Sequence, residues 1–293
     1  MEISCIIVNY NNAKFVAQAI QSVLNQTRVP DEIIIADDAS TDDSPEIIKK
    51  LAAVDVRIRP IFRDQNLGVS KNRDLAIKQA SGKYITTLDG DDWYYPEKIE
   101  REYEVVKQGK NIIACSDIEM FGEEGILDFI KVAPFCKLDN SYDWIRFLGA
   151  RKRGIPRDMM MPKCLYQEVN GLRHSLKRYE DWDLDFRLTN TGALWRYSGT
   201  KGTAYRRVGS GLSSVSLVRH LFAELAVLFS VFFKLRMKMK MALFFGALEL
   251  LLIKGPLRSF YPSSLIKIRK MRDVFAKVAS KDISGLGGHN GTS

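Results

Sequence analysis

The chain has 293 residues, of which 46% are hydrophobic and 27% are charged, and this length allows one large domain with an appendage. The net charge of +9 is concentrated at one end, because residues 215–293 contain 13 Lys/Arg and 4 Asp/Glu and so account for all of it. A nucleic-acid-binding protein would carry basic residues across its main fold, so this distribution argues against nucleic acid and favours an anionic membrane surface as a partner.

The four cysteines lie far apart in the sequence and form no CxxC pair: Cys5, Cys115, Cys136 and Cys164. This spacing is typical of reduced thiols in a cytosolic protein rather than of a disulfide framework or a zinc site. Residues 1–8 are strand-like, with Glu2 where a secretory leader would carry a basic residue, so we expect no signal peptide.

Four short apolar runs in the first 90 residues predict buried strands, at residues 4–8, 33–36, 56–62 and 84–88. The intervening segments carry apolar residues at helical spacing and predict helices at about 15–24, around 47–51, and at about 70–80. Strands that alternate with helices in this way predict a parallel α/β sheet with right-handed crossovers.

The second half of the chain is less regular, and residues 117–150 show no clear period. We expect a helix from Pro96 to about residue 108, a strand at 112–116 and an extended segment at 195–207. A further helix begins near Glu180, and its first turn contains Asp181. The helix dipole favours carboxylates there, so a purely structural role for these acids is one alternative.

An acidic cluster, Asp89-Gly90-Asp91-Asp92, directly follows the last of the four strands. Such a cluster can be a solvated turn, or it can hold a divalent cation, with a glycine that lets the backbone approach a ligand. Asn9 and Asp38 also follow strands, and α/β proteins bind ligands at the edge where the carboxyl ends of parallel strands meet. Polar residues at three strand ends favour the binding site over the turn.

Two common nucleotide motifs are missing from the sequence, since no GxGxxG follows the first strand and no GxxxxGK[ST] occurs. Dinucleotide-binding and P-loop NTPase sites therefore lose their main support. A phosphoaspartyl phosphatase would need a DxD pattern after the first strand, where this chain has Asn9-Tyr10-Asn11. That enzyme class is disfavoured for the same reason.

Five blocks, in order, resemble the inverting glycosyltransferases of family 2, which have the GT-A fold. They are CIIVNYN with SVLNQT, IADDASTD, NLGVS with Arg73, LDGDD, and EDW with Leu184 and Arg187. The resemblance covers residues 3 to about 214. It implies one α/β domain at 1–214 with a central, mostly parallel sheet, whose first half binds the nucleotide and whose second half shapes the acceptor site.

The resemblance implies nucleotide contacts for residues in the first four blocks. Tyr10 is expected near the base with Asn9 beside it, and Asp38 is expected to accept the N3–H of uracil or thymine. That N–H is an imide hydrogen-bond donor, which cytosine lacks. The sugar substrate is therefore expected to be a UDP- or dTDP-sugar. Arg73 matches a basic residue near the nucleotide, and Asp89 is expected against the ribose or the metal.

The resemblance also implies a metal ligand and a base. Asp91, with Asp89, is expected to bind Mn²⁺ or Mg²⁺, which acts as a Lewis acid on the departing diphosphate. Asp181 matches the catalytic base, while Glu180 and Trp182 are candidates for the acceptor side. One base without a covalent nucleophile implies inversion at the anomeric carbon.

Three positions depart from the family pattern. Val8-Asn9 replaces the common Pro-Thr, a change that is expected to matter little because the backbone carries much of that contact. Asp74 replaces the usual asparagine after Arg73, so Arg73 is expected to be paired partly within the chain. Val208 stands where many members have a histidine after Tyr-Arg-Arg, so one protein ligand to the metal or diphosphate is expected to be missing.

The expected function is the addition of one hexosyl or N-acetylhexosaminyl group to a hydroxyl of a glycan or lipid-linked glycan. This reaction would belong to the biosynthesis of a cell-surface polysaccharide or lipopolysaccharide. The alternative is a sugar-nucleotide-binding scaffold without turnover, against which the retained Asp91 and Asp181 argue.

The tail predicts a basic amphipathic helical segment at 215–280 and a disordered terminus at 281–293. Its apolar runs are too short or too often interrupted by charge for a membrane span. Residues 217–272 could instead lie on anionic lipid, which would make the protein peripheral at the cytoplasmic face of the cell membrane. The alternative is a helical hairpin that packs on the catalytic domain or on another subunit.

Overall fold

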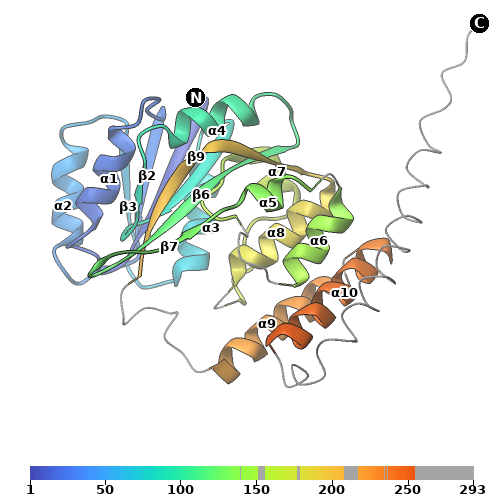
Figure 1. Cartoon of the computed structure of the whole chain (residues 1–293). Coiled ribbons are helices and arrows are strands. Elements are labelled where there is room, and N and C mark those ends of the chain that lie inside the picture. Colours follow the sequence, from blue (N-terminus) through green and yellow to red (C-terminus); the bar gives the residue numbers. More distant parts are fainter. Residues whose placement is uncertain are drawn as a thin grey trace, which may run out of the picture.

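The computed structural model describes residues 1–138, 140–150, 156–176, 179–207, 217–233, 235 and 237–254. Strand and helix alternate through the first 90 residues, which confirms the predicted α/β class (Figure 1). These elements are β1 (Ile3–Asn9), α1 (Val16–Leu24), β2 (Glu32–Asp37), α2 (Ser44–Ala52), β3 (Ile58–Phe62), α3 (Val69–Gln79) and β4 (Tyr84–Asp89).

The first sheet has the order β3-β2-β1-β4-β8, in which β1 to β4 are parallel and β8 (Met161–Pro162) is antiparallel to β4. The register pairs Asn9 with Asp37 and Val8 with Asp89. The carboxyl ends of β1, β2 and β4 therefore lie side by side, and the polar residues that follow these strands meet at one edge.

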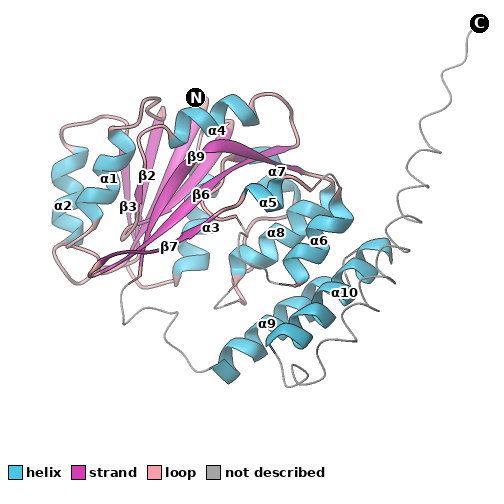
Figure 2. Ribbon diagram, viewed as in Figure 1, coloured by secondary structure: helices cyan, strands magenta, loops and turns pink. Residues whose placement is uncertain are grey.

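The second half of the chain builds a smaller sheet of order β5-β9-β6-β7 with helices beside it (Figure 2). Residues 117–150, which show no clear period in the sequence, contain the end of β6 together with β7, α5 and α6. The elements are β5 (Trp93–Tyr94), α4 (Lys98–Val106), β6 (Ile112–Gly122), β7 (Gly125–Ile130), α5 (Ala133–Cys136), α6 (Ser141–Gly149), α7 (Lys163–Glu168), α8 (Glu180–Thr191) and β9 (Leu194–Arg206).

The central strands are buried on both faces, because helices cover the first sheet on both sides. Ile6 and Ile34 pack in a cluster with side chains of α3, α6 and α8. Cys5 and Ile33, one position earlier, pack in a second cluster with α1, α2 and α4. Alternate side chains of a strand point to opposite faces, which explains why these strands read as continuous apolar runs.

The described part of the tail forms two helices, α9 (Leu217–Phe232) and α10 (Met237–Lys254), which pack on α8 and α6 (Figure 1). Arg173 links α8 to α9, since its Nη1 donates to Asp183 Oδ1 at 2.6 Å and to Ser230 Oγ at 3.0 Å. A Cβ placed on Gly246 of α10 would lie 2.5 Å from the carbonyl oxygen of Arg146 in α6. The two helices form a hairpin that packs on α6 and α8.

Other expectations for the tail fall partly outside the described residues. The boundary at residue 214, the segment 255–280 and the terminus at 281–293 all lie there. None of the helices that the structure describes has the length and apolar character needed to cross a bilayer.

Replacement of Gly246 by leucine tests the contact between α10 and α6. The new side chain meets the backbone of α6, so we expect the free energy of unfolding to fall by about 1–3 kcal/mol and trypsin to cleave the tail faster. The control is Met237→Leu, in the exposed first turn of the same helix. Equal melting temperatures and cleavage rates for the two variants would show that α10 does not depend on this contact.

Candidate active site

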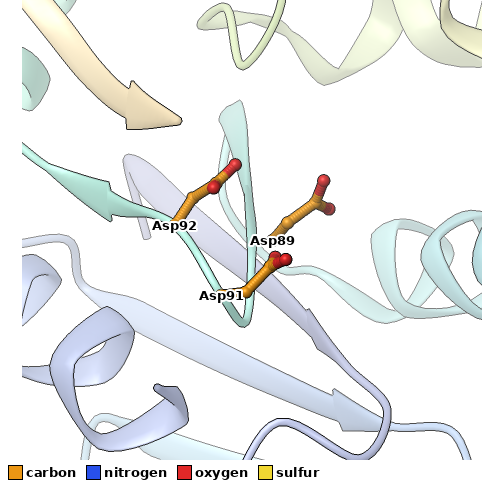
Figure 3. Close-up of side chains that lie close together, drawn as sticks. All are labelled: Asp89, Asp91 and Asp92. Carbon is orange, nitrogen blue, oxygen red and sulfur yellow. The ribbon is translucent and has the colours of Figure 1, made fainter. Parts of the chain in front are cut away.

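The acidic cluster forms a tight turn between β4 and β5. The Gly90 N–H donates to the Val8 carbonyl at 2.8 Å, and the Asp92 N–H donates to the Asp89 carbonyl at 3.0 Å. Figure 3 shows the carboxylates of Asp89, Asp91 and Asp92 grouped around this turn. One oxygen from each lies within 4.8 Å of the other two, so the turn brings three acidic ligand atoms together.

Gly90 is needed for a contact within the protein. A Cβ at this position would lie 2.5 Å from Asn9 Oδ1. The glycine therefore makes room for the Asn9 side chain at the end of β1, and not for a ligand as expected from the sequence. The Asn9 side chain is itself buried, and its Nδ2 donates to Asp37 Oδ1 at 2.8 Å. In this structure Asn9 supports the neighbouring strand ends from inside the sheet edge.

Two arginines neutralise Asp89. Arg73 of α3 contacts Asp89 Oδ1, and Arg157 Nη2 donates to Asp89 Oδ2 at 3.0 Å. Burial alone would raise the pKa of Asp89, but the charges of Arg73 and Arg157 outweigh this effect and hold the pKa below its ordinary value. Asp89 is therefore ionised at neutral pH.

The negative charges of Asp91 and Asp92 are less well compensated by nearby positive charges. Burial, followed by the charge of Asp89, raises the pKa of Asp91 to about 6, and burial also raises the pKa of Asp92 well above its usual range. Asp92 Oδ1 accepts the backbone N–H of Arg206 at 2.7 Å, whereas its Oδ2 is buried and has no hydrogen-bond partner. Arg157 Nη2 lies 3.7 Å from this oxygen. A buried oxygen without a hydrogen bond costs free energy, which a bound cation would recover.

This set of ligand atoms fits a small divalent ion. Mg²⁺ and Mn²⁺ prefer oxygen ligands and are usually bound by one or two carboxylates together with substrate phosphates. The three carboxylates supply one such oxygen each, and Asp92 Oδ2 has no hydrogen-bond partner among the described residues.

Asp38, at the end of β2, holds the loop between β3 and α3. Its two oxygens accept the backbone N–H groups of Leu67 and Gly68, each at 2.8 Å. The orientation of this buried carboxylate is thereby fixed, while a carboxylate has further lone pairs for another donor. Tyr10, at the end of β1, is 47% exposed and faces solvent at the same edge.

Arg73 connects the acidic cluster to α8. Its Nη1 lies 3.7 Å from Glu180 Oε1, while the same guanidinium contacts Asp89. Burial, with the nearby charge of Asp181, raises the pKa of Glu180 to about 7. The first turn of α8 is thus held beside the acidic cluster by an ion-pair chain, Asp89–Arg73–Glu180.

The other two candidates on α8 have different surroundings. Asp181 is exposed, and its Oδ1 accepts the backbone N–H of Trp182 at 2.8 Å. The Trp182 ring is buried, and its Nε1 donates to the Leu148 carbonyl of α6 at 3.1 Å. Trp182 therefore anchors α8 to the core while Asp181 faces outwards.

Two arginines at the site carry no recognisable sequence signal. Arg157 precedes the two-residue strand β8, and no motif marks it. Arg206, at the end of β9, donates from Nε to the Asp91 carbonyl at 2.9 Å. The sequence marks Arg206 only through the Tyr-Arg-Arg string that precedes Val208, and Val208 lies outside the described part of the chain.

Arg73 is paired within the chain, as expected, but its partners are Asp89 and Glu180 and not the neighbouring Asp74. Asp74 turns away from the site and accepts the Tyr166 hydroxyl at 2.8 Å, with Lys78 Nζ at 2.7 Å and His174 Nε2 at 2.8 Å. Neighbouring residues on a helix point in directions about 100° apart, so Arg73 and Asp74 face different parts of the protein.

Comparison with known proteins agrees with this geometry. Residues 4–155 match the model of the family described as glycosyl transferase family 2. An uncharacterized glycosyltransferase of Rickettsia bellii is 38% identical over 124 residues, which are 42% of this chain and 18% of that relative. The putative teichuronic acid biosynthesis glycosyltransferase TuaG of Bacillus subtilis is 28% identical over 123 residues, or 42% of this chain and 49% of TuaG. The matched segments span less than half of either relative.

The fold has solved counterparts. The structure of residues 1–349 of TarS from S. aureus in complex with UDP-GlcNAc superposes with a TM-score of 0.70 at 18% identity, and the match covers 89% of this chain and 75% of that one. This similarity concerns the fold, which is GT-A. The family match extends over more than half of the sequence, and the chain belongs to glycosyl transferase family 2.

Proposed function

We propose that this chain transfers one hexosyl or N-acetylhexosaminyl group, with inversion, from a UDP- or dTDP-sugar to a hydroxyl of a glycan or lipid-linked glycan. The observation that carries the proposal is the ion-pair chain Asp89–Arg73–Glu180, which joins a carboxylate cluster to the acidic start of α8. The relatives support the substrate class, because TuaG is named for teichuronic acid biosynthesis and TarS was solved with UDP-GlcNAc.

The donor would lie along the carboxyl edge of the first sheet. Asp38 is oriented by two backbone amides and presents its remaining lone pairs to an imide N–H, while Tyr10 is exposed for packing on a base. Asp91, with Asp89 and Asp92, would hold Mn²⁺ or Mg²⁺. When bound, that ion supplies Lewis-acid stabilisation of the departing diphosphate.

The acceptor would approach the outer side of α8. Asp181 is exposed, and within the described part of the chain its hydrogen bond comes from the Trp182 N–H to Oδ1, so Oδ2 would take the proton of an attacking hydroxyl. Glu180 points to Arg73 and holds that arginine between the two halves of the site. With one base and no covalent nucleophile, the sugar inverts.

The first test is a panel of UDP- and dTDP-sugars with Mn²⁺, read by thermal shift and by donor hydrolysis, on wild type and Asp91→Asn. We expect Mn²⁺-dependent binding of a donor to the wild type and a loss of hydrolysis of about 100-fold or more in the variant, because a charged metal ligand is removed. Asp43→Asn, at an exposed helix start, is the control. Binding without any turnover would favour the scaffold alternative, and no metal-dependent binding would contradict the proposal.

A second test separates the two acids of α8. Asp181→Asn removes the base, so we expect kcat to fall by about 10²–10⁴-fold while the donor affinity stays near that of the wild type. Glu180→Gln loosens Arg73 instead, so we expect it to weaken donor binding. Steady-state kinetics and calorimetry of UDP binding measure both effects. An unchanged kcat in Asp181→Asn would exclude this residue as the base.

We also propose that the hairpin of α9 and α10 rests on the cytoplasmic face of an anionic membrane, as in polysaccharide or lipopolysaccharide biosynthesis on lipid carriers. A groove of about 660 Å³ in the hairpin is lined by apolar side chains, among them Leu225, Phe229, Phe233 and Phe244. Phe229 and Phe233 are 68% and 65% exposed. The net positive charge of residues 215–293 in the sequence favours anionic lipid as the partner.

Liposome flotation tests the membrane proposal. We expect wild type to float with vesicles that contain anionic lipid, and the Phe229→Glu/Phe233→Glu double variant to stay in the lower fraction, because charge on the apolar face opposes insertion. The control is Ile126→Glu/Leu127→Glu on β7, where both side chains are also more than half exposed. Equal flotation of the two double variants would contradict the proposed surface.

A further inference from the structure

Arg157 lies beside the acidic cluster although no motif marks it. Its Nη2 is 3.0 Å from Asp89 Oδ2 and 3.7 Å from Asp92 Oδ2, and its Nε is 3.2 Å from Asp158 Oδ2. The guanidinium carbon lies 4.3 Å from the ring centroid of Tyr205. Arg157 therefore contacts two of the three acids that form the candidate metal site.

The backbone beside Arg157 is firmly held. Lys98, a buried residue of α4, donates from Nζ to the Asp158 carbonyl at 2.7 Å and pairs with Glu102 at 2.9 Å. Asp158 has a φ of 51°, in the left-handed region that non-glycine residues rarely adopt. A fixed backbone with a long side chain allows the guanidinium to change partners while its attachment point stays in place.

The two arginines on Asp89 differ in how freely they can change partners. Arg73 is committed at both ends of its guanidinium, to Asp89 and to Glu180. Arg157 occupies Asp89 Oδ2 and approaches Asp92 Oδ2, the oxygen without a hydrogen bond. A divalent ion on these carboxylates competes with Arg157 for the same oxygens and repels its positive charge.

A diphosphate offers Arg157 a second set of partners. Its oxygens carry several negative charges, and the planar guanidinium binds phosphate oxygens through two parallel hydrogen bonds. Tyr205 and Asp158 keep the guanidinium beside the acidic cluster, so Arg157 would be within reach of a diphosphate that the cluster holds through a metal.

We propose that Arg157 is a diphosphate-binding residue that exchanges partners, leaving Asp89 and Asp92 for the diphosphate of the donor when the metal binds. This inference rests on the proposed function. It predicts effects of opposite sign for one substitution: Arg157 competes with the metal alone but cooperates with the metal in binding the nucleotide. A purely structural arginine would not separate these two affinities.

The test uses the full chain with Arg157→Met and Arg157→Lys at one fixed pH. Binding of Mn²⁺ alone is measured by the electron paramagnetic resonance signal of the free ion, and binding of UDP at saturating Mn²⁺ by calorimetry. We expect Arg157→Met to bind Mn²⁺ at least threefold more tightly and UDP at least tenfold more weakly than wild type. Arg101→Met, which removes an exposed arginine paired with Glu97 on α4, should change neither affinity.

Arg157→Lys keeps the charge but loses the paired hydrogen bonds, so we expect weaker UDP binding with Mn²⁺ affinity no lower than in wild type. If Arg157→Met does not fold, the comparison is made with Arg157→Lys alone. Weaker binding of both ligands, or an unchanged affinity for UDP, would overturn the proposal. If Mn²⁺ does not aid UDP binding to the wild type, the proposed function itself fails, which distinguishes that failure from an error about Arg157.

Discussion

The site depends on how the negative charges of buried carboxylates at one edge of a parallel sheet are compensated by nearby positive charges. Asp89, Asp91 and Asp92 are brought within 4.8 Å of one another by a turn, and like charges at this separation raise the free energy of the folded chain. Two arginines offset part of this cost, while the pKa of Asp91 stays raised to about 6. The cluster therefore has an electrostatic preference for further positive charge, which is the property that a cation site requires.

The same compensation aligns the two halves of the site. Arg73 contacts Asp89 on one side and Glu180 on the other, so the position of α8 is coupled to the end of β4. Arg206 supplies a second connection, since its backbone N–H is bound by Asp92 and its Nε by the Asp91 carbonyl. Residues from α3, α8 and β9 thus converge on a turn of four residues, and each contributes charge or a hydrogen bond that the turn alone lacks.

In the first 90 residues, local patterns were sufficient to predict the strands and helices and the polar residues that follow the strands, whereas β7, α5 and α6 were not predicted. Parallel strands buried on both faces are continuous apolar runs, and acids after such a run lie at the sheet edge by topology. Contacts between distant segments were not predictable in this way. Arg157 reaches Asp89 only because β8 pairs with β4, and a strand of two residues has no sequence signal. The choice of partner for Asp74 was missed for a similar reason, since Tyr166 and His174 come from a region without a clear pattern.

The link from α8 to α9 has a geometric consequence for the reaction. Asp183, two residues after Asp181, shares Arg173 with Ser230 of α9, and Phe229 and Phe233 are neighbours of Ser230 on the exposed side of the hairpin. The proposed base and the aromatic surface are therefore parts of one packed unit. If that surface rests on a bilayer, the base stands at a fixed height above the lipid headgroups. Acceptors would then be selected by the distance between their hydroxyl and their lipid anchor, a molecular ruler that works without contact to the rest of the glycan.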